Sequence, residues 1–425
     1  MKLLPLVLCA SCSIAPPTVP WARSFGAAGR ETATSLAESA DGGVLLAGVT
    51  LSSFNAEGTH PWLVRVTADG GVMWQEMLAG AKSETQPLLA ARPGGFILAA
   101  TTYSDGAGKA DVWVVSIDDD GSIAWQEALG GGFDETVSGL VVRSDGSIDV
   151  LGTTLSFGAG NMDWLLIHIK ADGSVVSAQT YGDSDDQAAG GLARFSDDSL
   201  ILVGQTSTHG DSDVAFAFVD NKGELGEPVA IGGTGTELAT AIATEKDTFT
   251  LLATTDSFGA GGTDAWVLQG GRDGKVNTQR VLGNGGEDHL VSLRSNWALG
   301  TTTVGADTQL WLVGLAIGGA VTAERSYGGA GVDDGAAIGE APNGDLWLHG
   351  TTSSFGNTGP DLWLSRLDSS LDLFQLGASV TTKHTSTEAK PRALSFTTGT
   401  AQLQIHKTQI VPLATNGRVI PTVGD

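Results

Sequence analysis

Residues 152–165 read GTTLSFGAGNMDWL, and closely similar segments stand at 254–267 and 350–364. Each segment joins a Thr-Thr pair to a Ser-Phe-Gly turn and then to an Asp that a Trp follows within two residues. The glycines of a second turn recur at steps of 51, 52, 50 and 51 residues, at Gly70, Gly121, Gly173, Gly223 and Gly274. A repeat of this length indicates an array of similar units, each of which buries its apolar face against its neighbours.

Each repeat contains four short segments with the composition of β-strands. In the first repeat these are residues 33–37, 44–49, 62–67 and 72–77, which are rich in β-branched and aromatic residues. Asp-Gly, Gly-Gly or Ser-Phe-Gly turns separate the segments, and no long apolar period of 3.6 residues indicates a helix. Four strands in about 50 residues are typical of a β-propeller blade.

The sequence therefore predicts an all-β fold, a single β-propeller of four-stranded antiparallel blades over residues 21–425. Seven repeats are clear between residues 21 and 374, and residues 375–425 hold a degenerate eighth copy, so we expect eight blades. Seven blades with a separate C-terminal tail are the alternative. The segment around Trp21 has the pattern of a fourth strand, and we expect it to close the last blade together with the C-terminal strands.

The composition excludes several classes of protein. Of the 425 residues, 48 are acidic and 23 are basic, which gives a net charge of −25, and 41% are hydrophobic, which is enough to form a core. Nucleic acid is an improbable partner, because phosphate contact requires clustered Lys and Arg. The two cysteines are Cys9 and Cys12. The body of the chain therefore has neither a disulfide framework nor a Cys-ligated metal site.

The first twelve residues, MKLLPLVLCASC, have the layout of a secretory signal peptide, with one Lys, a short apolar run and small residues. Ala10-Ser11-Cys12 resembles a bacterial lipobox, although Cys9 stands where Leu is usual. In that interpretation Cys12 is lipidated, and residues 13–20 form a Pro-rich tether. We therefore expect a protein of the bacterial cell envelope, either an outer-membrane lipoprotein that touches the membrane only through its lipid anchor or a secreted or periplasmic protein. An ordinary cleaved signal peptide is the alternative.

The repeated pattern resembles that of secreted β-propeller repeat proteins and lipoproteins of bacteria. The residues that carry the resemblance are Thr-x-Ser-Phe-Gly-Ala-Gly and the following Asp and Trp-Leu, as in residues 152–165. The Asp-Gly-x-x-x-Trp hairpin that ends at Trp125 is distantly similar to tryptophan-docking propellers. The resemblance implies the fold and says little about function, because propellers carry many unrelated activities.

Acidic residues recur at two places in each repeat. One set stands just before the first strand, at Glu31, Glu84, Glu135, Asp186, Glu237, Asp288, Asp333 and Glu388. The other set stands just before the third strand, at Asp111, Asp163, Asp213, Asp264 and Asp361, with His60 and Gln309 as exceptions. Both sets are expected at one mouth of the channel. They either pin their loops through backbone N–H groups and Thr hydroxyls or form a ligand or cation face, for which calcium is the candidate ion.

The remaining repeated residues favour structural roles. All eleven tryptophans fall in predicted strands, where we expect them to wedge blade against blade. Four arginines lie at or near the ends of first strands and are expected at the opposite mouth, as solvated turn residues or as an anion-binding patch: Arg92, Arg143, Arg194 and Arg294.

No established catalytic motif stands in the sequence. We find no G-x-S-x-G, H-E-x-x-H or P-loop pattern, and the seven histidines lack the spacing of metal ligands. We therefore predict a monomeric, non-enzymatic binding or scaffold module for a protein or a glycan. We expect no cofactor, with bound calcium as the alternative. The alternatives are a propeller enzyme, either a quinoprotein-like dehydrogenase or a polysaccharide-acting enzyme, and a calcium-stabilised surface protein.

Overall fold

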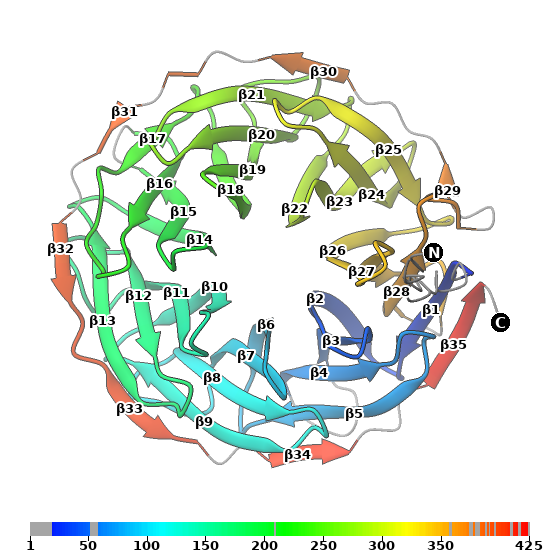
Figure 1. Ribbon diagram of the computed structural model, residues 1–425, viewed down its shortest axis with the longest axis horizontal. Coiled ribbons are helices and arrows are strands. Elements are labelled where there is room, and N and C mark those ends of the chain that lie inside the picture. Colours follow the sequence, from blue (N-terminus) through cyan, green and yellow to red (C-terminus); the bar gives the residue numbers. More distant parts are fainter. Residues whose placement is uncertain are drawn as a thin grey trace, which may run out of the picture.

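The computed structural model describes residues 19–51, 58–207, 210–356 and 359–373, and seven short segments of the C-terminal region, 377–378, 383–386, 389–390, 392–394, 397–408, 411–414 and 418–423. Within these residues every regular element is a β-strand, and no helix is long and apolar enough to cross a membrane. The strands form seven sheets around a central channel (Figure 1). The predictions of a signal peptide and of lipidation at Cys12 fall on residues 1–18, which lie outside the described residues.

The seven sheets are the blades of a propeller, and we number them in chain order. Blade 1 contains β2 (Arg30–Glu38), β3 (Val44–Leu51), β4 (Thr59–Val66) and β5 (Val72–Ala79). Blade 2 contains β6 (Glu84–Arg92), β7 (Gly95–Thr102), β8 (Asp111–Asp118) and β9 (Ile123–Gly130). Blade 3 contains β10 (Glu135–Val142), β11 (Ile148–Thr154), β12 (Asp163–Ile169) and β13 (Val175–Gly182).

Blades 4 to 7 repeat this order. Blade 4 contains β14 (Gln187–Arg194), β15 (Leu200–Thr206), β16 (Asp213–Val219) and β17 (Val229–Ile231). Blade 5 contains β18 (Glu237–Glu245), β19 (Thr248–Thr255), β20 (Asp264–Gly271) and β21 (Val276–Gly283). Blade 6 contains β22 (Asp288–Arg294), β23 (Trp297–Val304), β24 (Asp307–Leu315) and β25 (Val321–Tyr327). Blade 7 contains β26 (Asp333–Glu340), β27 (Leu346–Thr352), β28 (Asp361–Leu367) and the N-terminal β1 (Trp21–Gly26).

The antiparallel order of the strands gives the propeller two different faces. The first strand of each blade lines the channel, and neighbouring strands pair antiparallel out to the fourth (Figure 1). We call the side with the hairpins between first and second and between third and fourth strands the hairpin face. The opposite side, where the chain enters first and third strands, is the loop face.

The hydrophobic core lies between the blades rather than at the centre of the ring. Seven clusters of buried apolar residues form it, one at each blade junction. The third-strand tryptophans are fully buried in these clusters, at Trp62, Trp113, Trp164, Trp266, Trp311 and Trp363. Each ring removes about 150–250 Å² of surface from water, so the predicted wedges hold neighbouring blades together.

The N-terminal strand closes the ring. β1 pairs with β28 as the fourth strand of blade 7, and its Trp21 ring packs edge-on against Trp347 at a centroid distance of 5.6 Å. The C-terminal β35 (Arg418–Val423) pairs with the outer edge of β1. The prediction that the segment around Trp21 closes the last blade with C-terminal strands is therefore confirmed, but the last blade is the seventh.

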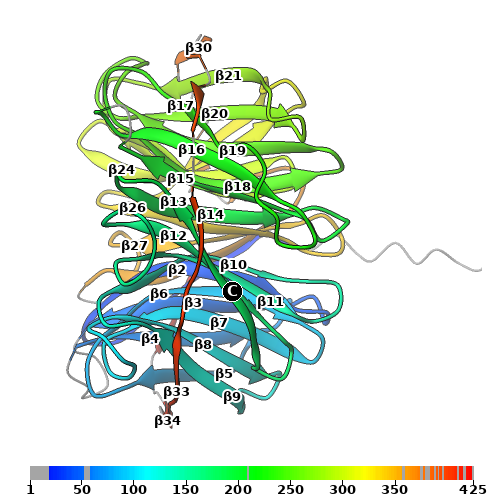
Figure 2. The same ribbon diagram turned by 90° about the vertical axis from the view of Figure 1, so that its left-hand side faces the viewer.

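The expectation of eight blades is wrong, and the alternative of seven blades is confirmed. The C-terminal residues run around the rim in the reverse order of the blades and add a fifth strand to each one (Figures 1 and 2). These strands are β29 (Gly377–Ala378) on blade 6, β30 (Lys383–Ser386) on blade 5, β31 (Arg392–Ala393) on blade 4, β32 (Thr397–Thr400) on blade 3, β33 (Gln404–Lys407) on blade 2, β34 (Val411–Ala414) on blade 1 and β35 on blade 7. We call β29–β35 the belt.

Strand length explains why the degenerate copy forms a belt instead of a blade. The belt strands have two to six residues, whereas the first strands of the blades have seven to nine. Such short strands cannot build a four-stranded sheet, but they can satisfy the free backbone groups along the outer edges of existing sheets. Side chains also fasten the belt, since the Trp113 indole N–H donates a hydrogen bond to the Thr408 hydroxyl at 3.3 Å.

Candidate functional site

The positions that begin the first strands form a ring of buried polar side chains at the loop face. In blade 3, Oε2 of Glu135 accepts a hydrogen bond from the Gly131 N–H at 2.6 Å, and Oε1 accepts one from the Thr154 hydroxyl at 2.7 Å. The same two bonds recur, with the carboxylates fully buried, at Glu31, Glu84, Glu237, Asp288 and Asp333. These side chains hold the loop that enters each blade and do not face solvent.

Blade 4 departs from the predicted residue at this position. Gln187 occupies the buried place, where its Oε1 accepts the Asp183 N–H at 2.9 Å and its Nε2 donates to Thr206 at 3.4 Å. The predicted Asp186 lies one residue earlier and is only partly buried. The prediction considered only Asp and Glu at this position and therefore missed Gln187. The Gln187 amide has the shape of a Glu carboxylate and makes equivalent hydrogen bonds. Glu388 lies outside the described residues.

The acids before the third strands lie next to this ring and are also buried. In blade 3, Oδ2 of Asp163 accepts the Gly160 N–H at 3.1 Å. Gly158, at a φ of +116°, and Gly182 lie so close to Asp163 that a Cβ on either would overlap the carboxylate. The Ser-Phe-Gly-Ala-Gly segment is thus a loop that closes over a buried aspartate, and only glycine leaves the room for it. The equivalent buried residues are Asp111, Asp213, Asp264 and Asp361.

The two threonines of the repeated segment connect different blades. Thr154 binds Glu135 within blade 3, whereas the hydroxyl of Thr153 accepts the N–H of Ala189 in blade 4 at 2.9 Å. In the same way Thr351 of blade 7 accepts the N–H of Ala33 in blade 1 at 2.9 Å. The motif therefore encodes blade junctions, which explains why it recurs around the ring.

The exceptions to the pattern are compensated by other residues. His60 stands in place of an Asp, and its Nδ1 lies 2.7 Å from Oε2 of Glu84 in the ring. Gln309 occupies the corresponding place in blade 6, opposite Thr302. In blade 4, which lacks the Ser-Phe-Gly segment, Arg392 of the belt binds Oδ2 of Asp213 at 2.5 Å. The belt thus takes part in the loop-face network.

Burial controls the ionisation of these aspartates. It raises the pKa of Asp264, and the nearby carboxylates of Asp288 and Glu287 raise that pKa further. Oδ2 of Asp264 accepts the Ala260 N–H at 2.8 Å, whereas its buried Oδ1 has no hydrogen-bond partner among the described residues. In the part of the chain that the structure describes, no three or more His, Cys, Asp or Glu side chains are grouped to hold a metal ion.

Replacement of Asp264 by Asn is expected to stabilise the protein at neutral pH. Because the folded-state pKa is raised, the favourable contribution of this group is complete below its unfolded pKa and is lost as the pH rises through the folded value. A charged carboxylate is unfavourable in this buried place, and an amide removes that charge. Thermal unfolding should therefore show Asp264→Asn melting above wild type at pH 7, with the difference shrinking towards pH 4. A difference that stays constant with pH would contradict this account.

The open cavity of the molecule lies at the hairpin face. It has a volume of about 1340 Å³, and residues of the first strands of all seven blades line it. Apolar side chains form much of its wall, among them Leu88, Leu140, Leu192, Ile242 and Ile338. Its volume exceeds the 300–1,000 Å³ that is usual for ligand pockets.

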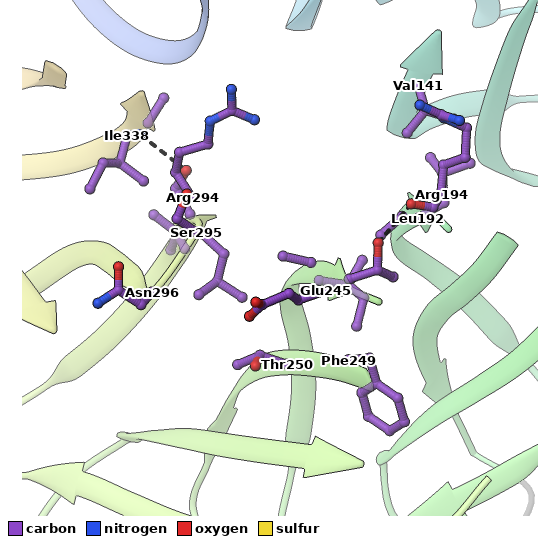
Figure 3. A pocket seen from close by; sticks show the side chains of 18 of the residues that line it. Val141, Leu192, Arg194, Glu245, Phe249, Thr250, Arg294, Ser295, Asn296 and Ile338 are labelled. Atoms are coloured by element: carbon purple, nitrogen blue, oxygen red, sulfur yellow. Dashed lines mark hydrogen bonds between the residues drawn. The ribbon is translucent and has the colours of Figure 1, made fainter. Parts of the chain in front are cut away.

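Charged groups at the cavity are few and mostly paired. Figure 3 shows Arg194 and Arg294 on opposite sides of the cavity, with Glu245 projecting between them. Arg194 binds Asp198 at 2.6 Å, and Arg294 binds Glu38 at 2.8 Å. The other two arginines predicted at this mouth do not line the cavity, because Arg92 pairs with Asp118 and Arg143 pairs with Asp149.

The cavity is not symmetric, since it extends outward only over blades 5 and 6. The residues that line this branch are Thr250, Gln269, Asn277, Thr278, Ala316, Ile317 and Gly318. Gln269 organises the branch, because its Nε2 donates to Thr250 at 3.2 Å and its Oε1 accepts the Gly318 N–H at 2.8 Å. Sequence reasoning missed these residues, because the fourth strands of blades 3 to 6 all lack a Trp and this absence does not single out blades 5 and 6.

Comparisons with known proteins find distant structural similarity alone. No protein-family model and no curated protein sequence matches the chain. Among solved structures it is similar to the Pan2 WD40 domain of Neurospora crassa, with 10% identity, coverage of 82% of this chain and 91% of that one, and a TM-score of 0.44. It is also similar to the polysaccharide lyase Uly1 (8% identity, 78% and 89% coverage, TM-score 0.43) and to a gluconolactonase of Xanthomonas campestris (13% identity, 84% and 100% coverage, TM-score 0.38). These similarities select no activity for this chain.

Proposed function

We propose that this propeller is a non-enzymatic binding module whose ligand, a protein segment or a glycan, enters the cavity at the hairpin face. The observation that carries the proposal is the cavity itself, which is large, open and lined by all seven blades. The lining residues include no His, Cys, Lys or Asp, and the hydroxyl of Ser295 at the wall donates to the Glu340 carboxylate at 2.5 Å. Apolar side chains with a few polar groups among them are typical of a recognition surface.

A substitution that fills the cavity tests the proposal. Ala91 of β6 is exposed and lines the cavity, so Ala91→Trp places a large ring in the ligand's path without disturbing a buried contact. We expect this variant to lose a ligand that wild type retains from envelope extract or from a glycan array, with binding at least tenfold weaker. Ala124→Trp is the matched control, because Ala124 is equally exposed on β9 but does not line the cavity. Equal retention by all three proteins would place the binding site elsewhere, and retention by none would reject a binding function.

The proposal includes a location in the bacterial envelope, which rests on the sequence of residues 1–12. Lipidation of Cys12 would tether the propeller to the membrane through residues 13–20, which precede β1 in the chain. Incorporation of labelled palmitate into wild type but not into Cys12→Ser tests the anchor, and an unlabelled wild type would reject it.

A further inference from the structure

At three junctions of the ring, a fourth-strand tryptophan covers the hairpin of the next blade. The indole N–H of Trp74 in blade 1 donates to the carbonyl of Asp119 in blade 2 at 2.9 Å. Trp125 of blade 2 donates likewise to Ala171 of blade 3 at 3.0 Å. Trp21 of blade 7 lies 3.0 Å from the position of a Cβ on Gly70 in blade 1. These rings fill the space between neighbouring blades at the hairpin face.

The fourth strands of blades 3 to 6 lack this ring, and among their junctions the cavity branches outward at the one between blades 5 and 6. Thr278 stands five residues before Gly283, the place that Trp125 takes before Gly130. Its Cγ2 lies 3.1 Å from the position of a Cβ on Gly319, so a small side chain faces the hairpin that an indole covers elsewhere. At the tip of that hairpin Ile317 is 94% exposed. The cavity enters this gap and branches outward there, whereas at the junction of blades 3 and 4, where Ser177 takes the same place, it does not.

The walls of the branch carry hydrogen-bonding groups and no charge. Thr250, Gln269, Asn277 and Thr278 present hydroxyl and amide groups, and Ile317 adds an apolar surface. An anionic polymer would find no Lys or Arg among the residues that line the branch and would approach a chain of net charge −25. A peptide bound through its backbone requires a free strand edge. In the described residues, β30 of the belt pairs with the outer edge of β21 from Arg280 to Gly283, so a peptide could add only along the short remaining part of that strand, Val276–Gln279.

We propose that this branch, which we call the 5–6 groove, is a subsite for a neutral oligosaccharide that extends outward from the central cavity. The inference rests on the proposed binding function and names its ligand class. The hydroxyl groups of a linear glycan can form hydrogen bonds with the amides and hydroxyls of the groove. The faces of its sugar rings can pack against Ile317. A disaccharide occupies the central cavity alone, whereas a hexasaccharide continues into the groove.

The test restores the missing ring. Thr278→Trp is expected to close the groove by packing over Gly319, with its indole N–H directed at the carbonyl of Ile317. Ser177→Trp is the matched control, because Ser177 is exposed at the same place of blade 3 and does not line the cavity. Calorimetric titrations use cellohexaose, maltohexaose and laminarihexaose, the matching disaccharides, and hexagalacturonate as a charged chain of the same length.

We expect wild type and Ser177→Trp to bind at least one neutral hexasaccharide tenfold or more tightly than its disaccharide, and Thr278→Trp to bind both alike. Asn277→Ala, a milder change at an exposed position, should weaken hexasaccharide binding about fivefold, which keeps the test valid if Thr278→Trp folds poorly. Unchanged hexasaccharide binding by Thr278→Trp and Asn277→Ala overturns the inference, as does preference for hexagalacturonate or binding of no hexasaccharide. If extract ligands are still lost in Ala91→Trp, the binding function stands and only the groove is rejected.

Discussion

Deletion of residues 377–425 is expected to destabilise the propeller by on the order of 5–10 kcal/mol and to make it associate through its rim. The belt pairs with the outer strand of all seven blades, and β35 also covers the closing strand β1. Each backbone hydrogen bond contributes about 0.5–1.5 kcal/mol, and the belt makes such bonds on every blade. Its loss exposes seven strand edges at once, and exposed edges pair with other chains.

Urea unfolding followed by circular dichroism, together with sedimentation velocity, measures both effects. A synthetic peptide of residues 377–425 added to the truncated protein should restore part of the stability and the monomeric state. Arg392→Ala is a graded control, since it removes only the ion pair with Asp213 and should cost about 1–3 kcal/mol. A truncated protein that stays monomeric with an unchanged urea midpoint would show that the belt does not stabilise the blades.

Replacement of Glu135 by Leu is expected to cost about 2–5 kcal/mol, because it leaves two buried donors unsatisfied. These donors are the N–H of Gly131 and the hydroxyl of Thr154, which the carboxylate now accepts at 2.6 and 2.7 Å. Glu135→Gln should cost less than about 1 kcal/mol, because an amide oxygen can still accept from the loop. Blade 4 already carries this arrangement at Gln187.

Thermal and urea unfolding of the two variants measure the difference. The reciprocal change, Gln187→Glu, is the matched control, and it should fold normally because six other blades hold a carboxylate at this place. Equal losses for Glu135→Leu and Glu135→Gln would mean that the charge, and not the hydrogen bonds, holds the loop. A loss in neither variant would remove the loop-holding role altogether.

Much of the blade could be predicted from the sequence, because the relevant forces are local. Strand alternation, Asp-Gly turns and the buried third-strand tryptophans follow from residues that are neighbours in the chain. The role of Trp21 was also predictable, since its segment repeats the pattern of later fourth strands. The polar rings were predictable in position, but their burial was not, because the depth of Glu135 depends on the loops of two blades that meet over it.

The order of the repeats along the chain determined that this protein is a propeller, because each unit of about 50 residues carries its own strands and turns and must stack on its neighbours to bury them. Only the tertiary structure decided that the ring closes at seven blades and that the final residues run backwards around it. The belt pairs with strands that are distant in sequence, and no local pattern specifies such partners. The 5–6 groove was decided in the same way, because the fourth strands of blades 3 and 5 both lack a Trp and only the packing of blades 5 and 6 opens the cavity outward.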